Sequence, residues 1–211
     1  AIWRAADEAL SFLEGTGRRN VLVELANEVD VVADHTQYSI FGADRVHEMI
    51  LRMRQAQPGL VYSASGGGVN AETGRGMPTP SLVEAADFLL PHGNGTRPPQ
   101  LAAAIRAIQS MPEYERDPKP IIINEDSPAV PNLDAAWRNG ASWGYFDQGF
   151  EGQGDDPYFS YTKAARKSSG PFSGLTGFQT PPVNWTINTP FKRAFFRRVA
   201  EITGASEGSG F

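Results

Sequence analysis

Two apolar stretches of the chain end in the same dipeptide, Asn-Glu. Residues 21–28 read VLVELANE and residues 120–126 read PIIINED, so carboxylates directly follow aliphatic and β-branched runs. Such runs are typical of parallel strands that are buried on both faces. The carboxyl ends of parallel strands share one edge of a sheet, where α/β enzymes have their active sites. We therefore expect Glu28 and Glu125 to meet as a pair of carboxylates.

Strand and helix patterns alternate along the rest of the chain, after a first helix expected over about residues 3–14. Strands are expected at residues 20–28, 60–64, 87–90, 120–124 and 141–146. Helices are expected at about residues 43–57, in a short segment capped by Ser81, from Pro98-Pro99 onward, at 132–139 and at 190–202. Residues 29–39 and 65–80 are expected to be loops. Strand–helix alternation with right-handed crossovers produces a parallel sheet.

Two parallel architectures fit this order, an open doubly wound sheet and a (β/α)8 barrel. A nucleotide-binding sheet is disfavoured, because no phosphate-binding glycine motif follows a strand and the run at residues 65–68, SGGG, does not open a helix. Five strands do not close a barrel, which needs eight. The sequence therefore predicts an α/β fold, the C-terminal five βα units of a TIM (β/α)8 barrel. They form one domain over residues 1–203, followed by a flexible tail at 204–211.

Composition excludes several classes of partner. The net charge of −5 is spread along the chain, so there is no extended basic surface for nucleic acid or an anionic membrane. No apolar run approaches the roughly 20 residues of a membrane span. The chain has no cysteine, which excludes disulfides and thiolate metal sites and leaves the cellular compartment open.

The order of elements and the two acids resemble the large clan of retaining (β/α)8-barrel glycoside hydrolases with acid/base on strand four and nucleophile on strand seven. Members often carry Glu-x-x-Asn-Glu on strand four, and residues 24–28 read ELANE. With residues 20–28 as strand four, residues 120–124 are strand seven and residues 141–146 are strand eight. The clan usually has an arginine at the end of strand two, a segment this sequence lacks. Activity is therefore expected to depend on a part of the barrel before Ala1.

This resemblance implies a role for each residue of the Asn-Glu sites. Glu28 would be the acid/base, Asn27 a donor to the sugar 2-hydroxyl, and Glu125 the nucleophile. Glycoside hydrolysis needs two such carboxyl groups. The resemblance thus implies a glycosidase that cleaves O-glycosidic bonds of a carbohydrate by double displacement, without cofactor or metal. It also favours a secreted or periplasmic protein.

Two histidines and two tryptophans complete the expected substrate site. His92 follows a strand beside a Gly-Asn-Gly turn, where it would bind substrate or a catalytic carboxylate, or pack the loop. The same alternatives apply to His35, in the loop after Glu28. By resemblance, Trp143 would stack on a sugar ring, and packing between barrel and helices is the alternative. Trp185 would either wall the cleft or hold a long loop onto the barrel.

Two other functions use the same residues. A non-catalytic carbohydrate-binding barrel remnant would keep the cleft at Trp143 and lack turnover. A metal-dependent TIM-barrel hydrolase would draw ligands from His35, His92, Asp30 and Glu125. These four residues lack the close spacing, such as His-x-x-x-His, that is common among zinc ligands.

Overall fold

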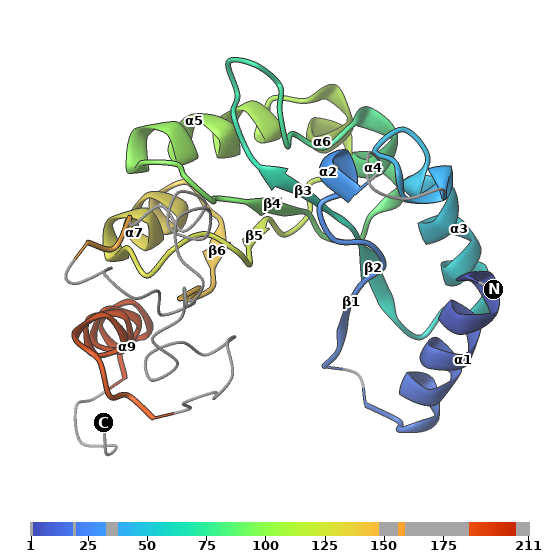
Figure 1. Ribbon diagram of the computed structural model, residues 1–211, viewed down its shortest axis with the longest axis horizontal. Helices are drawn as coiled ribbons and strands as arrows, with labels where there is room; N and C mark the ends of the chain where they lie inside the picture. The colour runs from blue at the N-terminus through green and yellow to red at the C-terminus, as the bar shows by residue number, and fades with distance from the viewer. Residues whose placement is uncertain (1, 19, 33–37, 148–155, 159–185, 206–211) are drawn as a thin grey trace, which may run out of the picture.

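The computed structural model describes residues 2–18, 20–32, 38–147, 156–158 and 186–205. Short strands run through its centre and helices cover their outer side (Figure 1). The strands are β1 Leu22–Glu24, β2 Val61–Ser63, β3 Ser65–Gly68, β4 Leu90–His92, β5 Ile122–Ile123 and β6 Ser142–Trp143. The helices are α1 Ile2–Gly15, α2 Val29–Val32, the 3-10 helix η2 Ser39–Phe41, α3 Val46–Ala56, α4 Pro80–Ala85, α5 Pro98–Gln109, α6 Pro112–Arg116, α7 Val130–Arg138 and α9 Pro190–Thr203.

The strands are parallel and lie side by side in sequence order. β1 pairs with β2, β3 with β4, and β5 with β6. Backbone hydrogen bonds join these pairs: Ser65 N donates to Ala26 O at 3.0 Å, and Ile122 N donates to Leu89 O at 2.8 Å. β2 and β3 are consecutive parts of one strand position. The described residues therefore form five parallel strand positions, as the sequence predicted.

These strand positions follow an open arc from β1 to β6, with α1, α3, α4, α5 and α7 on its outer side (Figure 1). The α/β class is confirmed, and the described strands do not close a barrel. That the arc belongs to a (β/α)8 barrel stays a prediction, as does the boundary at residue 203. Residues 206–211 of the expected tail lie outside the described part of the chain. None of the described helices is long and apolar enough to cross a membrane.

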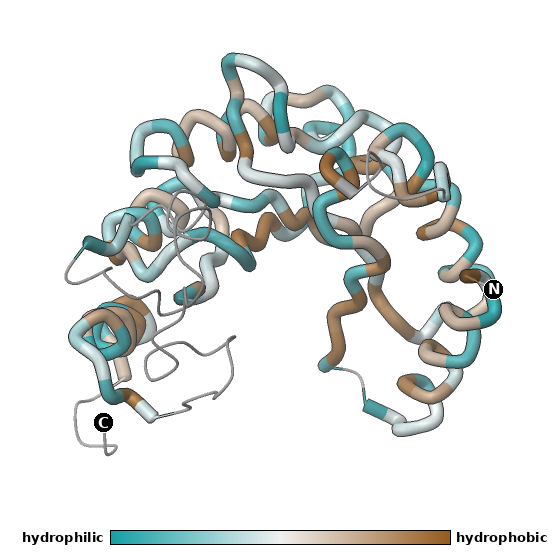
Figure 2. The backbone as a smooth tube through the Cα atoms, in the orientation of Figure 1, coloured by the Kyte–Doolittle hydropathy of each residue, from teal (hydrophilic) through white to brown (hydrophobic). Residues whose placement is uncertain are grey.

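The hydrophobic core lies between the helices and the strands. On α3, Val46, Met49, Ile50 and Met53 are buried, and this is the apolar stripe that the sequence pattern predicts. They join one core cluster with buried strand residues such as Tyr62 and with the apolar side of α5. In Figure 2 the chain is brown along β1, β2 and β5, whereas the helices alternate between brown and teal, as amphipathic helices do.

Strand β4 begins later than the sequence predicts. Residues 87–90 were expected to form it, but β4 is Leu90–His92. Asp87 explains the shift, because its side chain takes the place of a strand partner: Tyr62 N donates to Asp87 Oδ2 at 2.7 Å. Regular pairing with β3 starts only at Leu90. Three smaller differences involve short helices. Helix α2 lies within the expected loop 29–39 and η2 begins at its last residue, helix α6 was not expected, and the cap of α4 is Thr79 rather than Ser81.

The largest difference is β3, Ser65–Gly68, which the sequence predicts to be a loop. Glycine is rare in strands because it has no side chain to pack, and it is used where another backbone comes close. Both ends of the glycine run meet this condition. A Cβ at Gly66 would lie 2.5 Å from the Gly76 carbonyl oxygen, and one at Gly68 would lie 2.5 Å from the Asn94 carbonyl oxygen. The glycines therefore let two loops pack directly on the strand.

We expect Gly68→Ala to lower the free energy of unfolding by about 1–3 kcal/mol, the usual cost of forcing a methyl group into a closely packed site. Gly15→Ala is the matched control, because a Cβ there meets nothing within 4 Å and alanine favours a helix. Chemical denaturation of both variants measures the difference. Equal stability of Gly68→Ala and the unmodified protein would contradict the close approach of Asn94 to β3.

Candidate active site

The structure brings Glu28, His92 and Glu125 together at the carboxyl ends of the strands. One ligand atom from each, an oxygen of either acid and a ring nitrogen of His92, lies within 4.8 Å of the others. His92 Nδ1 is 3.2 Å from Glu28 Oε1 and 3.8 Å from Glu125 Oε2. The side chains of Glu28 and Glu125 are 26% and 22% exposed, so both acids can reach a ligand.

Glu28 lies in a tight turn between β1 and α2. Its φ is +49°, and it is the one non-glycine residue with positive φ in the described chain. For a glutamate this backbone conformation costs of the order of 1–3 kcal/mol and persists only where its surroundings impose it. β3 provides those surroundings. Glu28 N donates to Ser65 Oγ at 2.9 Å, and Gly67 N donates to Asp30 Oδ1 at 2.6 Å.

Glu125 is held from the loop after β4. Asn94 Nδ2 donates to Glu125 Oε1 at 2.8 Å, and Gly93 N donates to the Glu125 carbonyl oxygen at 2.7 Å. One carboxylate oxygen therefore has a fixed partner, and the other, Oε2, faces His92. This arrangement fixes the rotamer of Glu125 while leaving an oxygen free to react.

His92 is the side chain that touches both acids. It is fully buried, and its Nδ1 is within hydrogen-bond distance of Glu28 Oε1. A carboxylate only accepts, so Nδ1 donates when Glu28 is ionised. Nε2 has no hydrogen-bond partner among the described residues. Of the roles predicted for His92, contact with a carboxylate is the one that the geometry matches.

Asp126 is the buried neighbour of Glu125. Its Oδ2 accepts hydrogen bonds from Asn132 Nδ2 at 2.8 Å and from Trp143 Nε1 at 2.7 Å. Burial raises the pKa of Asp126 to about 6, against the opposing effect of these hydrogen bonds. Asp126 thus links α7 and β6 through hydrogen bonds, next to Glu125 of the proposed catalytic pair.

Trp143 is the hydrogen-bond partner of Asp126 on β6. It is 8% exposed, and its ring packs on Phe195 of α9 at a centroid distance of 5.8 Å. These contacts match the packing alternative that the sequence left open. A sugar contact through the remaining exposed edge stays a prediction. Asn27 is exposed, and its Oδ1 accepts from Ser65 Oγ at 3.3 Å, so its amide nitrogen remains available for a ligand.

His35 and Trp185 fall outside the described residues. The structure adds side chains that sequence reasoning missed, Ser65, Asn94 and Asn132. Asn94 had a local signal, since it stands in the Gly-Asn-Gly turn directly after His92. Ser65 and Asn132 had none, because their partners lie 37 and 6 positions away and only the fold makes the contacts.

In the metal-site alternative, the ligands that the structure brings together differ from those that the sequence predicts. His35 lies outside the described residues and Asp30 accepts from Gly67 N, but Glu28, His92 and Glu125 are close enough to surround one cation. Three protein ligands with an open position are what a catalytic zinc site requires. Binding through His92 Nδ1 would replace its hydrogen bond to Glu28.

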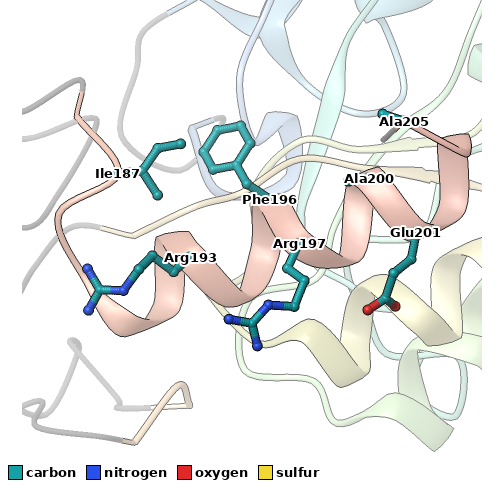
Figure 3. Close-up of a pocket in the computed structure, with 7 residues that line it drawn as sticks. All are labelled: Ile187, Arg193, Phe196, Arg197, Ala200, Glu201 and Ala205. Atoms are coloured by element: carbon teal, nitrogen blue, oxygen red, sulfur yellow. The ribbon is translucent and has the colours of Figure 1, made fainter. Parts of the chain in front are cut away.

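Two cavities lie near these elements. One, of about 420 Å³, lies between the loops that follow β3 and β4, and Asn94 lines it. Another, of about 410 Å³, runs along α9, where Arg193, Phe196 and Arg197 project from the helix and Ile187 lies beside its start (Figure 3). No predicted site residue is among the described residues that line the cavity on α9.

Comparison with known proteins gives two solved structures and no match at the sequence level. No family model matches the chain, and no curated protein matches it. An endo-β-1,4-mannanase from Thermotoga petrophila is 12% identical with a TM-score of 0.45, over 80% of this chain and 41% of that chain. A hyperthermostable endo-1,4-β-D-mannanase from Thermotoga petrophila RKU-1, with maltose and glycerol, is 13% identical with a TM-score of 0.43, over 76% and 51%. The chain thus spans about half the length of these mannanases, or less.

The raised pKa of Asp126 predicts how stability varies with pH. Well below the ordinary pKa of 3.8 the carboxyl is protonated in both folded and unfolded chains. As pH rises toward 6, the unfolded chain loses its proton first, so the folded state loses up to about 3 kcal/mol of stability relative to acid conditions. Asp126→Asn keeps an acceptor for Asn132 and Trp143 and removes the titration. We expect its stability relative to the unmodified protein to increase between pH 4 and 7.

Denaturation at several pH values measures this difference. Asp44→Asn is the control, since Asp44 is exposed on the surface. A stability difference between Asp126→Asn and the unmodified protein that stays constant from pH 4 to 7 would contradict the prediction.

Proposed function

We propose that this chain carries the catalytic acids of a retaining glycoside hydrolase that cleaves O-glycosidic bonds of a carbohydrate. The observation that carries the proposal is the approach of Glu28 and Glu125 at one edge of a parallel sheet, with an oxygen of each within 4.8 Å. Two carboxyl groups in this position are what glycoside hydrolysis requires.

The separation favours retention over inversion. Retaining enzymes hold their two carboxyl groups about 5–5.5 Å apart, so that one can attack the sugar directly. Inverting enzymes leave about 6.5–9.5 Å for a water molecule between the second carboxylate and the sugar. One oxygen of each acid lies within 4.8 Å of the other, which is nearer to the retaining spacing than to the inverting one and supports direct attack.

In the proposed mechanism, Glu125 attacks the anomeric carbon and Glu28 protonates the departing oxygen. Asn94 occupies Glu125 Oε1, which leaves Oε2 as the attacking atom. The bond from the anomeric carbon to Oε2 forms as the glycosidic bond breaks, and the Glu28 proton moves to the leaving group. Glu28 then deprotonates the water that releases the sugar from Glu125.

His92 positions both acids in this scheme. Its Nδ1 is within hydrogen-bond distance of Glu28 and can donate to the carboxylate that acts as a base in the second step. Asn27 is assigned to the sugar 2-hydroxyl and Trp143 to the edge of the sugar site. His35 and Trp185 remain candidates for substrate contacts.

The proposal includes a (β/α)8 barrel of which this chain supplies the second part. The first strand supports this view. On β1, Val23 is buried, whereas Leu22, 57% exposed, and Glu24 face away from the described core. An uncovered edge strand is a site for further strand pairing.

A metal-dependent hydrolase is the second candidate, because Glu28, His92 and Glu125 also fit around one cation. Metal analysis of the purified protein and activity after chelation separate the two. A stoichiometric metal, with activity lost on chelation and restored on adding it back, would favour the metal enzyme. Sugar binding without turnover would instead favour the carbohydrate-binding remnant.

Substitution of the acids tests the assignment of roles in the complete protein. Glu125→Gln is expected to abolish glycosidic cleavage. Glu28→Gln is expected to lower kcat by about 10²–10⁴-fold on substrates with poor leaving groups, and much less on aryl glycosides, whose leaving group needs no proton. Glu8→Gln, on the exposed side of α1, is the matched control and should retain full activity. Equal losses from Glu28→Gln on both kinds of substrate would contradict its role as the acid.

A fluorinated glycoside inactivator tests the nucleophile separately. It should form a stable ester with the attacking carboxylate, and peptide mapping should find the label on the peptide that contains Glu125. A label on the peptide containing Glu28 would reverse the two roles, and a label elsewhere would overturn the site.

A further inference from the structure

The cavity beside Asn94 lies next to the proposed catalytic pair. It is bounded by the loop after β3, residues 69–75, and by the start of the β4–α5 connection, residues 94–96, with Gln100 and Ala103 of α5. Asn94 both lines this cavity and donates to Glu125 Oε1 at 2.8 Å. A ligand in the cavity is therefore one side chain away from the proposed nucleophile.

The size of the cavity suits a small ligand. Its volume of about 420 Å³ falls in the range of about 300–1,000 Å³ that is usual for small-molecule sites. Two of its walls are loops at the carboxyl ends of strands, the same edge that carries Glu28 and Glu125, and α5 completes it through Gln100 and Ala103.

The loop that forms one wall is held in place by its own hydrogen bonds. Asn70 Oδ1 accepts from Glu72 N at 2.9 Å and from Thr73 N at 3.0 Å. Arg75 Nε and Nη2 donate to the Gly68 carbonyl oxygen at 3.1 and 3.0 Å, which fixes the guanidinium against β3. A preformed wall binds a ligand with little loss of conformational entropy.

The lining combines polar side chains with Val69, Ala71 and Ala103, and its charges are balanced. One acid, Glu72, and one base, Arg75, face the cavity with the amides of Asn70 and Gln100 and the hydroxyl of Thr73. Glu72 is exposed to solvent, so its carboxylate can reach a ligand in the cavity. An anionic ligand would meet the Glu72 carboxylate, and a cation would meet Arg75. A neutral molecule with many hydroxyl groups can donate to the carboxylate and accept from the guanidinium and amides.

We infer that this cavity is a subsite for a neutral sugar unit joined to the unit that is cleaved, with Glu72 and Arg75 as its specificity-determining side chains. The inference rests on the proposed function and extends it, because it makes the substrate an uncharged oligo- or polysaccharide. Binding energy from the cavity would then favour longer substrates over short ones.

The test compares substrates of different length on the complete protein. Glu72→Ala and Arg75→Met are expected to lower kcat/KM by about tenfold on neutral oligosaccharides long enough to reach the cavity, since each loses a charged hydrogen bond. Glu72→Ala should leave kcat/KM unchanged on an aryl glycoside with one sugar unit, whereas Arg75→Met also removes the hydrogen bonds to the Gly68 carbonyl oxygen and is read on the ratio of long to short substrates. Glu115→Ala, on the exposed surface of α6, is the matched control for both substrates.

Three results would overturn the subsite. Equal effects of Glu72→Ala on long and short substrates would place its role elsewhere. No effect of Glu72→Ala and Arg75→Met on either substrate would do the same. Uronic-acid oligosaccharides that bind as well as neutral ones would contradict the neutral class.

A binding measurement separates failure of the subsite from failure of the proposed function. If the complete protein hydrolyses no glycoside, the proposed function fails, and calorimetry with neutral oligosaccharides still tests the cavity. Affinity that rises with chain length and falls about tenfold in Glu72→Ala would support the subsite without catalysis. Affinity that ignores Glu72→Ala, or no binding at all, would overturn it.

Discussion

The close approach of backbones at β3 is the constraint on which the site depends. Gly66 and Gly68 carry no side chains, so the carbonyl oxygens of Gly76 and Asn94 come to positions that a Cβ would occupy. The Gly67 amide lies between them and donates to Asp30 at the start of α2. One short strand thereby sets the position of three neighbouring segments. These are the turn that carries Glu28, the loop after β3 that lines the cavity beside Asn94, and the loop that carries Asn94.

Hydrogen bonds across the strand ends turn this packing into a chemical arrangement. Ser65 fixes the backbone of Glu28, Asn94 fixes one oxygen of Glu125, and His92 lies between the two acids. Two carboxylates this close repel each other when both are ionised. In the proposed mechanism a proton resides on Glu28 and Glu125 is ionised, which relieves that repulsion. The same condition gives an acid and a nucleophile at one time.

The sequence predicted β1 and β5, which precede Glu28 and Glu125, because each lies in an apolar run that is followed by a carboxylate. It predicted α3 from the spacing of Val46, Ile50 and Met53. β3 was not predicted, because a glycine run has neither strand propensity nor hydrophobic periodicity. The reason for its glycines is the close approach of Gly76 and Asn94, which only the folded structure shows. Which face of its strand Trp143 occupies was not predicted for another reason. Alternation along a strand separates two faces without indicating which one is buried.

The backbone of Glu28 separates what the fold needs from what the chemistry needs. A φ of +49° is a conformation that glycine adopts without steric cost and that glutamate adopts only under constraint. The fold alone would be better served by a residue without a side chain at this turn. The proposed acid/base at position 28 therefore has a backbone conformation that lowers stability, and in this proposal folding and function make opposite demands on one residue.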